Sequence, residues 1–217
     1  MIEFNFATTN DEKILEVKRI CANLPTKNQK IAVKKLSSSS IEEPEETGAT
    51  FAENAEIKFI YYEQFSPKLE KNQFLITEDS GFEIYALENF PSVYSARFLK
   101  QFSSKLEAFS EIKNKLLAKN LPIELQKARF VCDICTRIDG EILHFHGISE
   151  GILSLTDVDD KSSKHMFELG FGYDPIFIPE DPTQENSPQT FSQMTGEKKD
   201  TLSHRAKAFK QFLNYIL

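Results

Sequence analysis

Apolar and polar residues alternate at the start of the chain and then change to a helical spacing. Residues 2–8 alternate, which predicts a strand. Apolar residues then recur at helical intervals from Ile14 to Leu24, and Asn10 is a residue type that commonly caps a helix N-terminus. We therefore expect a strand, a short polar turn and a helix, followed by a further short strand over residues 31–36.

A second helix is predicted by a capping box, in which Thr50 is the N-cap and Glu53 follows three residues later. The helix is expected to end near Phe65. Asn54 and Lys58 are four residues apart, so they share one face of it.

Residues 73–87 predict two strands that meet at Glu78-Asp79-Ser80-Gly81. Two adjacent carboxylates repel each other, and their burial is unfavourable unless a cation or a proton offsets the charge. One interpretation is a magnesium site, because carboxylate oxygens are good ligands for this ion and one carboxylate can activate water. The alternative is a solvated acidic turn, which is common between strands.

The remaining patterns predict a basic amphipathic helix over 103–119, a hairpin of strands 128–138 and 141–148, a tight loop over 170–175, and a C-terminal helix capped by Ser203. Asp139 and Gly140 form a strong turn signal between the hairpin strands. This mixture of helices and strands predicts an α/β fold with a mixed sheet.

Composition narrows the function classes. The chain has 217 residues, enough for one domain, 1–217, or for two lobes that share a core. A net charge of -7 argues against non-specific binding of nucleic acid. No segment reaches the roughly 18 apolar residues of a membrane span, and the N-terminus lacks a signal-peptide pattern, so we expect a cytoplasmic protein.

Carboxylates, a helix N-terminus and a group of basic residues form three candidate ligand sites. Glu46, Glu78 and Asp79 are candidates for Mg²⁺, with a solvated acidic loop as the alternative for Glu46. The first helix N-terminus, near Lys13, is a candidate phosphate site. A basic group near the last helix consists of Lys198, Lys199, His204 and Arg205. Because basic residues at a helix start oppose its dipole, a bound anion is one explanation and a solvated basic face is the other.

Three further patterns have a structural interpretation. Cys132 and Cys135 are spaced like metal ligands, but in a strand they face opposite sides, so they are expected to be ordinary cysteines. His144 and His146 share a face of their strand without an obvious third ligand, which favours a structural role. Phe171 and Tyr173 suit either packing or stacking on a nucleotide base.

Six segments, in this order, resemble the inosine triphosphate pyrophosphatase family, also called Ham1-like or RdgB-like. They are Ala7–Lys13, Glu45–Ala55, Glu78–Gly81, Tyr94–Arg97, Gly170–Pro175, and Lys199 with Ser203–Arg205. Each segment alone is moderately specific, but the ordered set covers nearly the whole chain and is highly specific.

The chain departs from the family pattern at a few positions. Thr9 stands where the family usually has glycine, and Glu78 stands where it often has aspartate. The segment Glu88–Ser92 replaces a glycine-rich run, so its loop is expected to differ in shape, and Leu169 replaces another glycine.

The resemblance implies an elongated α/β fold of the Ham1 type, with a long curved mixed sheet flanked by helices, a cleft between two lobes, and a homodimer. It implies a hydrolase that converts non-standard purine triphosphates (ITP, dITP, XTP) to the monophosphate and pyrophosphate, with Mg²⁺ as cofactor. Such an enzyme cleanses the nucleotide pool.

The resemblance also implies residue roles. Asp79 would be the general base and, with Glu46, a metal ligand. Ser80 and Lys58 would contact the substrate. The phosphates would be held by Thr8, Thr9, Asn10, Asp11, Glu12 and Lys13. The base pocket would be formed by Phe171, Gly172, Tyr173, Asp174, Lys199, His204 and Arg205.

Two other functions stay open on the sequence. The related Maf-like pyrophosphatases act on other modified nucleotides, although the Gly170–Pro175 and Ser203–Arg205 segments favour the first family. A catalytically silent nucleotide-binding module is the second alternative, because Thr9 and Ser92 replace family glycines.

Overall fold

The computed structural model describes residues 1–24, 29–36, 42–123, 126–155, 158, 164–181, 183 and 187–217. Its contacts divide the chain into two compact units. Unit 1 comprises Met1–Ser80, Val131–Ile148 and Ser203–Leu217, and unit 2 comprises Gly81–Phe130 and Ser149–Leu202. Each unit has buried hydrophobic clusters of its own.

Seven strands in the described part of the chain form one mixed sheet, in the order β2-β1-β3-β5-β6-β7, with β4 paired to β3. β1 is parallel to β2 and β3, whereas the pairs β3–β4 and β6–β7 are antiparallel. The strands are β1 Ile2–Phe6, β2 Ile31–Lys35, β3 Gln73–Ile84, β4 Phe90–Ser92, β5 Lys127–Ile138, β6 Glu141–Leu153 and β7 Phe177–Pro179. The predicted α/β class with a mixed sheet is therefore confirmed.

The helices of unit 1 are α1 Asp11–Asn23, α2 Phe51–Glu63 and α7 His204–Ile216. Those of unit 2 are α3 Ser95–Leu99, α4 Lys105–Ala118, α5 Lys164–Glu168 and α6 Gly196–Leu202, with the short 3-10 turns η1 Tyr85–Leu87, η4 Asp174–Ile176 and η6 Phe191–Gln193. No helix among the residues that the structure describes is long and apolar enough to cross a membrane.

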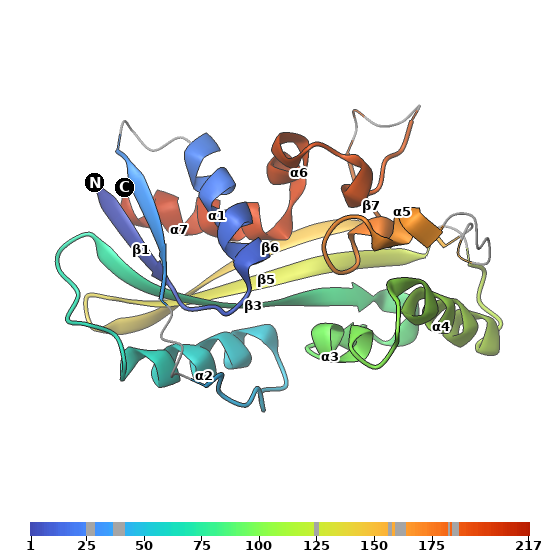
Figure 1. Cartoon of the computed structure of the whole chain (residues 1–217), viewed down its shortest axis with the longest axis horizontal. Coiled ribbons are helices and arrows are strands. Elements are labelled where there is room, and N and C mark those ends of the chain that lie inside the picture. Colours follow the sequence, from blue (N-terminus) through green and yellow to red (C-terminus); the bar gives the residue numbers. More distant parts are fainter. Residues whose placement is uncertain are drawn as a thin grey trace. The chain divides into compact units, whose positions relative to one another are not determined.

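Helices cover both faces of the strands in unit 1. Figure 1 shows α1 and α7 on one face and α2 on the other. Phe4, Phe6 and Ile76 pack in the cluster that contains residues of α1 and α7, whereas Leu75 packs with Phe59 of α2. Successive residues of a strand point to opposite faces, so the alternating apolar residues of β1 and β3 can serve both layers.

Aromatic rings fill the core of unit 2. Phe82 stacks on Tyr173, with ring centroids 4.8 Å apart, and also contacts Phe130 and Phe177. Phe109 of α4 packs in the same cluster. In Figure 1, α3 and α4 lie on the same face of this unit's strands. The 19 phenylalanines of a chain without tryptophan are in good part core residues.

The predicted helix caps and hairpin turn are present. The Asn10 side chain accepts hydrogen bonds from the backbone N–H groups of α1, and Thr50 and Glu53 form the capping box of α2. Ser203 caps α7. Between β5 and β6, Asp139 and Gly140 both have positive φ, 51° and 90°, as the tight primed hairpin turn requires.

The prediction of two strands around Glu78-Asp79 is wrong. β3 continues without a break from Gln73 to Ile84, through both carboxylates and Gly81. A turn is not needed to expose the charges, because basic side chains on each face of the strand pair with them. The solvated-turn interpretation is excluded for the same reason, since Glu78 and Asp79 are both buried.

Candidate functional site: a buried carboxylate and ammonium cluster on β3

Strand alternation sends the side chains of Glu78 and Asp79 to opposite faces of the sheet. Glu78 lies on the face covered by α1 and α7, where Arg205 binds it. Asp79 lies on the face covered by α2, where Lys58 and Asn54 bind it. The interpretation of Glu46, Glu78 and Asp79 as one ligand group is therefore wrong, and no group of three such ligands is found among the described residues.

Both oxygens of the Asp79 carboxylate are held by α2. The Lys58 Nζ lies 2.8 Å from Oδ1, and the Asn54 side-chain amide donates to Oδ2 at 3.2 Å. The same Nζ lies 2.5 Å from Glu46 Oε1 and donates to the backbone oxygen of Glu78 at 3.2 Å. One ammonium group thus lies between two carboxylates, and the helical spacing of Asn54 and Lys58 brings both to Asp79.

Gly48 holds the acidic segment with Glu46 against the start of α2. Its backbone N–H donates to the Asn54 side-chain oxygen at 2.8 Å. A Cβ at this glycine would lie 2.7 Å from that oxygen and 2.7 Å from the Cβ of Glu53, closer than real Cβ atoms approach. Only glycine permits this approach, so the local sequence determines where Glu46 lies.

Burial and charge act against each other at Asp79. Burial raises the pKa of Asp79 above its usual value, and Lys58 and Lys13 offset only part of this effect. Burial alone would lower the pKa of Lys58, but Asp79 and Glu46 raise it above its ordinary value, so this side chain remains an ammonium group. A carboxylate with an increased proton affinity beside a fixed cation is suited to accept a proton from water.

The donor set around Lys58 is compatible with a divalent metal. Two carboxylates, Glu46 and Asp79, approach one position closely enough to bind the same ammonium group. Mg²⁺ is commonly held by one or two carboxylates, with its other ligands coming from water and phosphate oxygens. These two residues fit that requirement without a third protein ligand.

The Glu78 carboxylate is bound on both oxygens by basic side chains. Arg205 Nε donates to Oε2 at 2.7 Å and Nη2 donates to Oε1 at 3.1 Å, and Lys13 Nζ lies 2.6 Å from Oε1. The Cys132 thiol also donates to Oε2, at 3.2 Å. Burial would raise the pKa of Glu78, but Arg205 and Lys13 hold it well below its usual value.

Arg205 has further partners within unit 1. Its Nη1 lies 2.5 Å from Glu16, and its Nη2 donates to the Ser80 hydroxyl at 3.1 Å. The residue is 1% exposed. Glu16 and Glu78 therefore provide the negative charge that a basic residue in the first turn of α7 needs, and no bound anion is required to explain its position.

Several of the residues expected at the substrate have protein partners in this structure, and their roles toward a substrate stay predictions. Lys13 and Ser80 contact Glu78, and Arg205 holds Glu78 and Ser80 together, whereas we expected these residues at the substrate. His204 is buried at the start of α7. Gly147 permits the close approach of α7 to β6, because a Cβ there would lie 2.0 Å from the His204 backbone oxygen.

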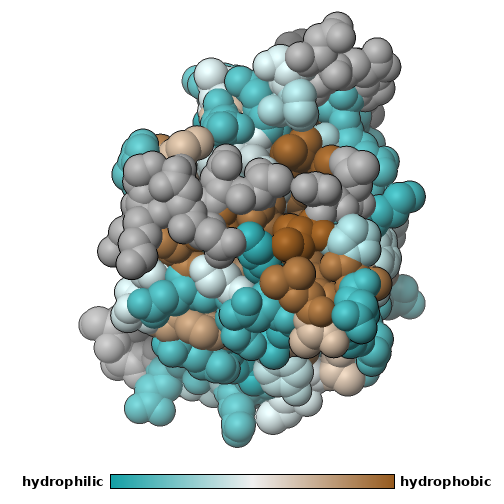
Figure 2. All heavy atoms as spheres, turned by 90° about the vertical axis from the view of Figure 1, so that its right-hand side faces the viewer, coloured by the Kyte–Doolittle hydropathy of each residue, from teal (hydrophilic) through white to brown (hydrophobic). Residues whose placement is uncertain are grey.

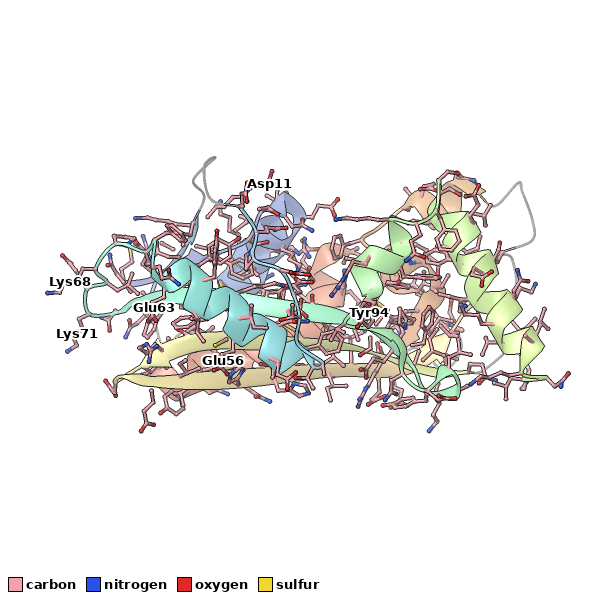
Figure 3. All side chains as sticks on the ribbon, turned by 90° about the horizontal axis from the view of Figure 1, so that it is seen from below. Asp11, Glu56, Glu63, Lys68, Lys71 and Tyr94 are labelled. Carbon is pink, nitrogen blue, oxygen red and sulfur yellow. The ribbon has the colours of Figure 1, made fainter. Side chains whose placement is uncertain are left out.

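The start of α1 has an ordered polar network. Asn10 Oδ1 accepts from the N–H groups of Glu12 at 2.9 Å and Lys13 at 3.3 Å, and Thr8 Oγ1 accepts from the N–H of Asn10. The Thr9 hydroxyl donates to Glu43. Asp11, labelled at the start of α1 in Figure 3, pairs with Lys35. Thr9 does not have a positive φ, so the chain does not require the family's glycine there.

The aromatic loop of unit 2 contains a buried ion pair. Lys199 Nζ lies 2.7 Å from Asp174 Oδ2, which also accepts from the backbone N–H of Phe171. Gly170 and Gly172 have positive φ, 74° and 52°, which shapes the tight loop.

Two other residues of unit 2 bear on what the sequence predicted. Tyr173 is a core residue, because its ring stacks on Phe82 and its hydroxyl donates to the Ser95 backbone oxygen at 2.8 Å. Ser92 keeps a left-handed φ of 49°, and its hydroxyl donates to Glu83 at 2.9 Å. This replacement of a family glycine is therefore accommodated by a hydrogen bond.

Two hollows in the surface lie apart from these charged groups. One, of about 370 Å³, belongs to unit 2 and is lined by residues that include Met166, Leu169 and Pro175. Figure 2 shows apolar side chains gathered on the face of this unit that is turned to the viewer. The other, of about 630 Å³, belongs to unit 1, between the segment after α2 and the β5–β6 turn. Asp79, Glu46 and Lys58 line neither hollow.

Sequence reasoning missed three residues of the site. Asn54 was placed on the Lys58 face of α2 but was given no role. Glu16 lies beside the apolar residues Ile14, Val17 and Ile20 of α1, and a carboxylate on that buried face was the available signal. Nothing in the spacing of Cys132 pointed to its bond with Glu78.

The fold and the site define a class: an α/β protein with a mixed sheet, whose central strand carries a buried carboxylate paired with an ammonium group beside a second carboxylate. A comparison with family models matches the Ham1 family over residues 4–215. This protein belongs to the Ham1 family. The resemblance identified in the sequence is thus confirmed.

Individual relatives agree with this assignment over nearly the whole chain. A dITP/XTP pyrophosphatase from Borrelia garinii subsp. bavariensis is 37% identical over 214 residues, which are 98% of this chain and 94% of the relative. One from Halalkalibacterium halodurans is 32% identical, with both chains covered completely. Among solved structures, a HAM1 protein from Coxiella burnetii has a TM-score of 0.73 at 27% identity and covers 100% of this chain and 98% of its own.

Proposed function

We propose that this protein is a nucleoside-triphosphate pyrophosphatase that hydrolyses non-standard purine nucleotides, such as ITP, dITP and XTP, to the monophosphate and pyrophosphate. The relatives named dITP/XTP pyrophosphatase, which match the chain from end to end, support the reaction and the substrate class. The observation that carries the proposal is the Asp79 carboxylate, buried and held by Lys58 and Asn54 beside Glu46.

Asp79 is the proposed general base. Burial raises the pKa of Asp79, and a general base is most effective when its pKa lies near the pH at which the enzyme works. Asn54 and Lys58 bind its two oxygens and thereby orient the carboxylate. In this role Asp79 takes a proton from the water that attacks the α-phosphorus, and pyrophosphate leaves.

Glu46 and Asp79 would hold Mg²⁺, which when bound neutralises charge on the phosphate oxygens. Lys58 supplies a permanent positive charge at the same carboxylates. Residues Thr8 to Lys13 at the start of α1 are the proposed phosphate contacts. Because Asn10 already caps the N–H groups of Glu12 and Lys13, we expect the phosphates to use side chains of this segment or its remaining N–H groups.

Phe171, Gly172 and Lys199 are the proposed contacts of the purine base. Phe171 and Gly172 are partly exposed, whereas Lys199 is buried against Asp174. A donor at the base favours a C6 oxo group, which accepts a hydrogen bond, over the amino group of adenine, and such matching can discriminate by up to about 10⁴-fold. In this proposal Tyr173, Asp174 and Arg205 act indirectly, by positioning the side chains and loop residues that they contact. The role of His204 at the base stays a prediction.

The experiment that tests the function compares dITP with ATP, in Mg²⁺ and in EDTA, and measures pyrophosphate and orthophosphate separately. We expect metal-dependent pyrophosphate from dITP and little from ATP. Orthophosphate release would contradict the proposed bond cleavage. Binding of dITP without turnover would support the silent module, and turnover of modified pyrimidine nucleotides alone would support the Maf-like alternative.

The homodimer expected from the resemblance belongs to the same proposal. Sedimentation velocity measures the oligomeric state directly. A monomer at the concentrations used for the activity assay would remove the dimer from the proposal without affecting the reaction.

A further inference from the structure

Two histidines and two carboxylates form a cluster in unit 1 that shares no contact with Asp79. Asp133 of β5 lies between His144 and His146 of β6, with His144 Nδ1 2.7 Å from Oδ1 and His146 Nδ1 3.1 Å from Oδ2. Glu56 of α2 lies on the other side of His144, with its Oε2 3.2 Å from Nε2. Figure 3 labels Glu56 on α2, near the strands that carry the histidines.

Both ring nitrogens of His144 therefore face carboxylate oxygens. A neutral imidazole has one N–H group and one lone pair, so it donates one hydrogen bond and would direct the lone pair at the second carboxylate. Both contacts are hydrogen bonds at once only when the ring is an imidazolium with a proton on each nitrogen. For His146 only the Nδ1 contact with Asp133 is recorded, and a neutral ring with its proton on Nδ1 can make it.

The surroundings of His144 favour a proton as the cation. Asp133 has a side chain only 6% exposed, and the His144 side chain is 29% exposed. Other charged or titratable groups on this face are Cys135 of β5 and the ion pair of Arg137 with Glu63. In the part of the chain that the structure describes, no group of three histidine, cysteine or carboxylate side chains is arranged to hold a metal ion.

This contact is one of several polar contacts between α2 and the sheet, which also include those of Asn54 with Asp79 and of Glu63 with Arg137 of β5. The Thr77 hydroxyl donates to the Ala55 backbone oxygen at 2.7 Å, and Lys58 binds Asp79. None of these other contacts needs a histidine proton, and among them only the pair of Glu63 with Arg137 is exposed. Among all of these contacts, the one between Glu56 and His144 is the one that changes with the protonation of an imidazole.

We propose that His144 is a positioning residue that, as an imidazolium, clamps Glu56 of α2 to the β5–β6 hairpin and releases this contact when it loses a proton. The clamp contributes to the stability of the fold only while both ring nitrogens carry protons. It affects the reaction because α2 carries Asn54 and Lys58, and this last step rests on the proposed function.

The first test observes the four histidines of the full chain by long-range ¹⁵N NMR between about pH 5 and 8, the range in which histidines titrate. The variant Glu56→Gln is the matched comparison, because its amide N–H can donate to a neutral Nε2 and the contact then needs no second proton. We expect the doubly protonated ring of His144 to persist to higher pH in the unchanged protein than in E56Q. Coincident titration curves for this ring in the two proteins would overturn the proposal.

The second test measures urea unfolding over the same pH range. The unfolding equilibrium constant of the unchanged protein is expected to rise with pH by about two- to five-fold more than that of E56Q, the size of a partly exposed ion pair. His146→Gln is the control and should keep this excess, because His146 is not needed to bridge α2. If the unfolding equilibrium constant of E56Q rises with pH as much as that of the unchanged protein, the clamp is refuted. This test does not require any variant of His144 to fold.

The third test follows pyrophosphate release from dITP in the same variants. We expect kcat of the unchanged protein to fall by about two- to five-fold at high pH, when the clamp is lost. The kcat of E56Q should not show this decrease. An identical profile in both would remove the link to the reaction. If the unchanged protein releases no pyrophosphate, the proposed function fails, while the NMR and unfolding measurements still decide the clamp.

Discussion

Two adjacent residues of β3 show how differently a protein can treat the same chemical group. Glu78 and Asp79 are both buried carboxylates within unit 1, yet the pKa of Glu78 is held well below its usual value and that of Asp79 is raised. Glu78 binds two basic side chains, Arg205 and Lys13. Asp79 shares a single ammonium group, that of Lys58, with Glu46.

The number of basic side chains in direct contact with each carboxylate, together with the repulsion of Asp79 by Glu46, accounts for the difference. Burial disfavours the ionised form on both faces, and only a sufficient positive charge reverses this effect. The Glu78 face therefore holds a permanent anion that joins α1, β3 and α7. The Asp79 face holds a carboxylate with an increased proton affinity, which is the property that a general base needs.

The largest expected effect comes from Asp79→Asn, which removes the base while the amide keeps the shape of the carboxylate. We expect kcat for dITP to fall by about 10³-fold or more, within the range for loss of general-base catalysis. Stability at neutral pH should not decrease, because a group whose ionised form is disfavoured by burial has been replaced by a neutral one. Turnover close to that of the unchanged enzyme, in a folded variant, would exclude Asp79 as the base.

On the face of β3 that carries Glu78, a substitution should lower the free energy of unfolding. Arg205→Met leaves Glu78 and Glu16 buried without their main partner, and loss of one member of such a group costs about 3–5 kcal/mol of unfolding free energy. Urea denaturation measures the change. The matched control is Arg137→Met, since the pair of Arg137 with Glu63 is exposed and should contribute about 1 kcal/mol or less. Equal losses in the two variants would contradict the contrast between buried and exposed pairs.

The pH dependence of stability should also distinguish the faces. The pKa of Glu78 is lowered on folding, so its contribution is present above the unfolded-state value of about 4.3 and is lost as the pH falls through the folded-state pKa. Asp79 has the opposite sign, because its raised pKa makes the ionised form unfavourable in the folded protein. Unfolding measured from about pH 7 downward should therefore show a smaller loss on acidification in Glu78→Gln than in the unchanged protein. A steeper acid loss in this variant would be inconsistent with the lowered pKa.

Lys58→Met should change the pH profile of the reaction. Loss of the ammonium group removes an interaction that lowers the pKa of Asp79, so that pKa rises further and the acidic limb of the kcat/KM profile moves to higher pH. At neutral pH kcat/KM is expected to fall by about 10²-fold, the size reported for loss of one positioned donor. A profile shifted to lower pH would show that Lys58 does not act on Asp79.

The smallest of these effects is expected from Gly48→Ala. Its methyl group would overlap the Asn54 oxygen and Glu53, which costs about 1–3 kcal/mol in unfolding free energy and displaces Glu46. Activity at limiting Mg²⁺ should fall more than activity at saturating Mg²⁺, because Glu46 is the proposed metal ligand. Gly140→Ala, at a hairpin turn with open space around its Cβ, is the control for general destabilisation by a glycine replacement.

The predicted elements that the structure confirms depend on local interactions. Asn10, the capping box of Thr50 and Glu53, and the Asp139-Gly140 turn involve only residues close in the chain, so the sequence contains their signals. The shared face of Asn54 and Lys58 follows from helical spacing alone. The break predicted at Glu78-Asp79 failed because it was judged from local charge, without the basic residues that neutralise it from α1, α2 and α7.

The sequence by itself therefore determined most of the elements and the family, and it pointed to Asp79 as the proposed general base. Only the tertiary structure decided that Arg205 binds Glu78 across 127 positions of the chain, and that Glu46 shares Lys58 with Asp79. The physical reason is range: caps and turns are satisfied within a few residues. The ionisation state of a buried carboxylate depends on which distant charges the fold brings within a few ångströms of it.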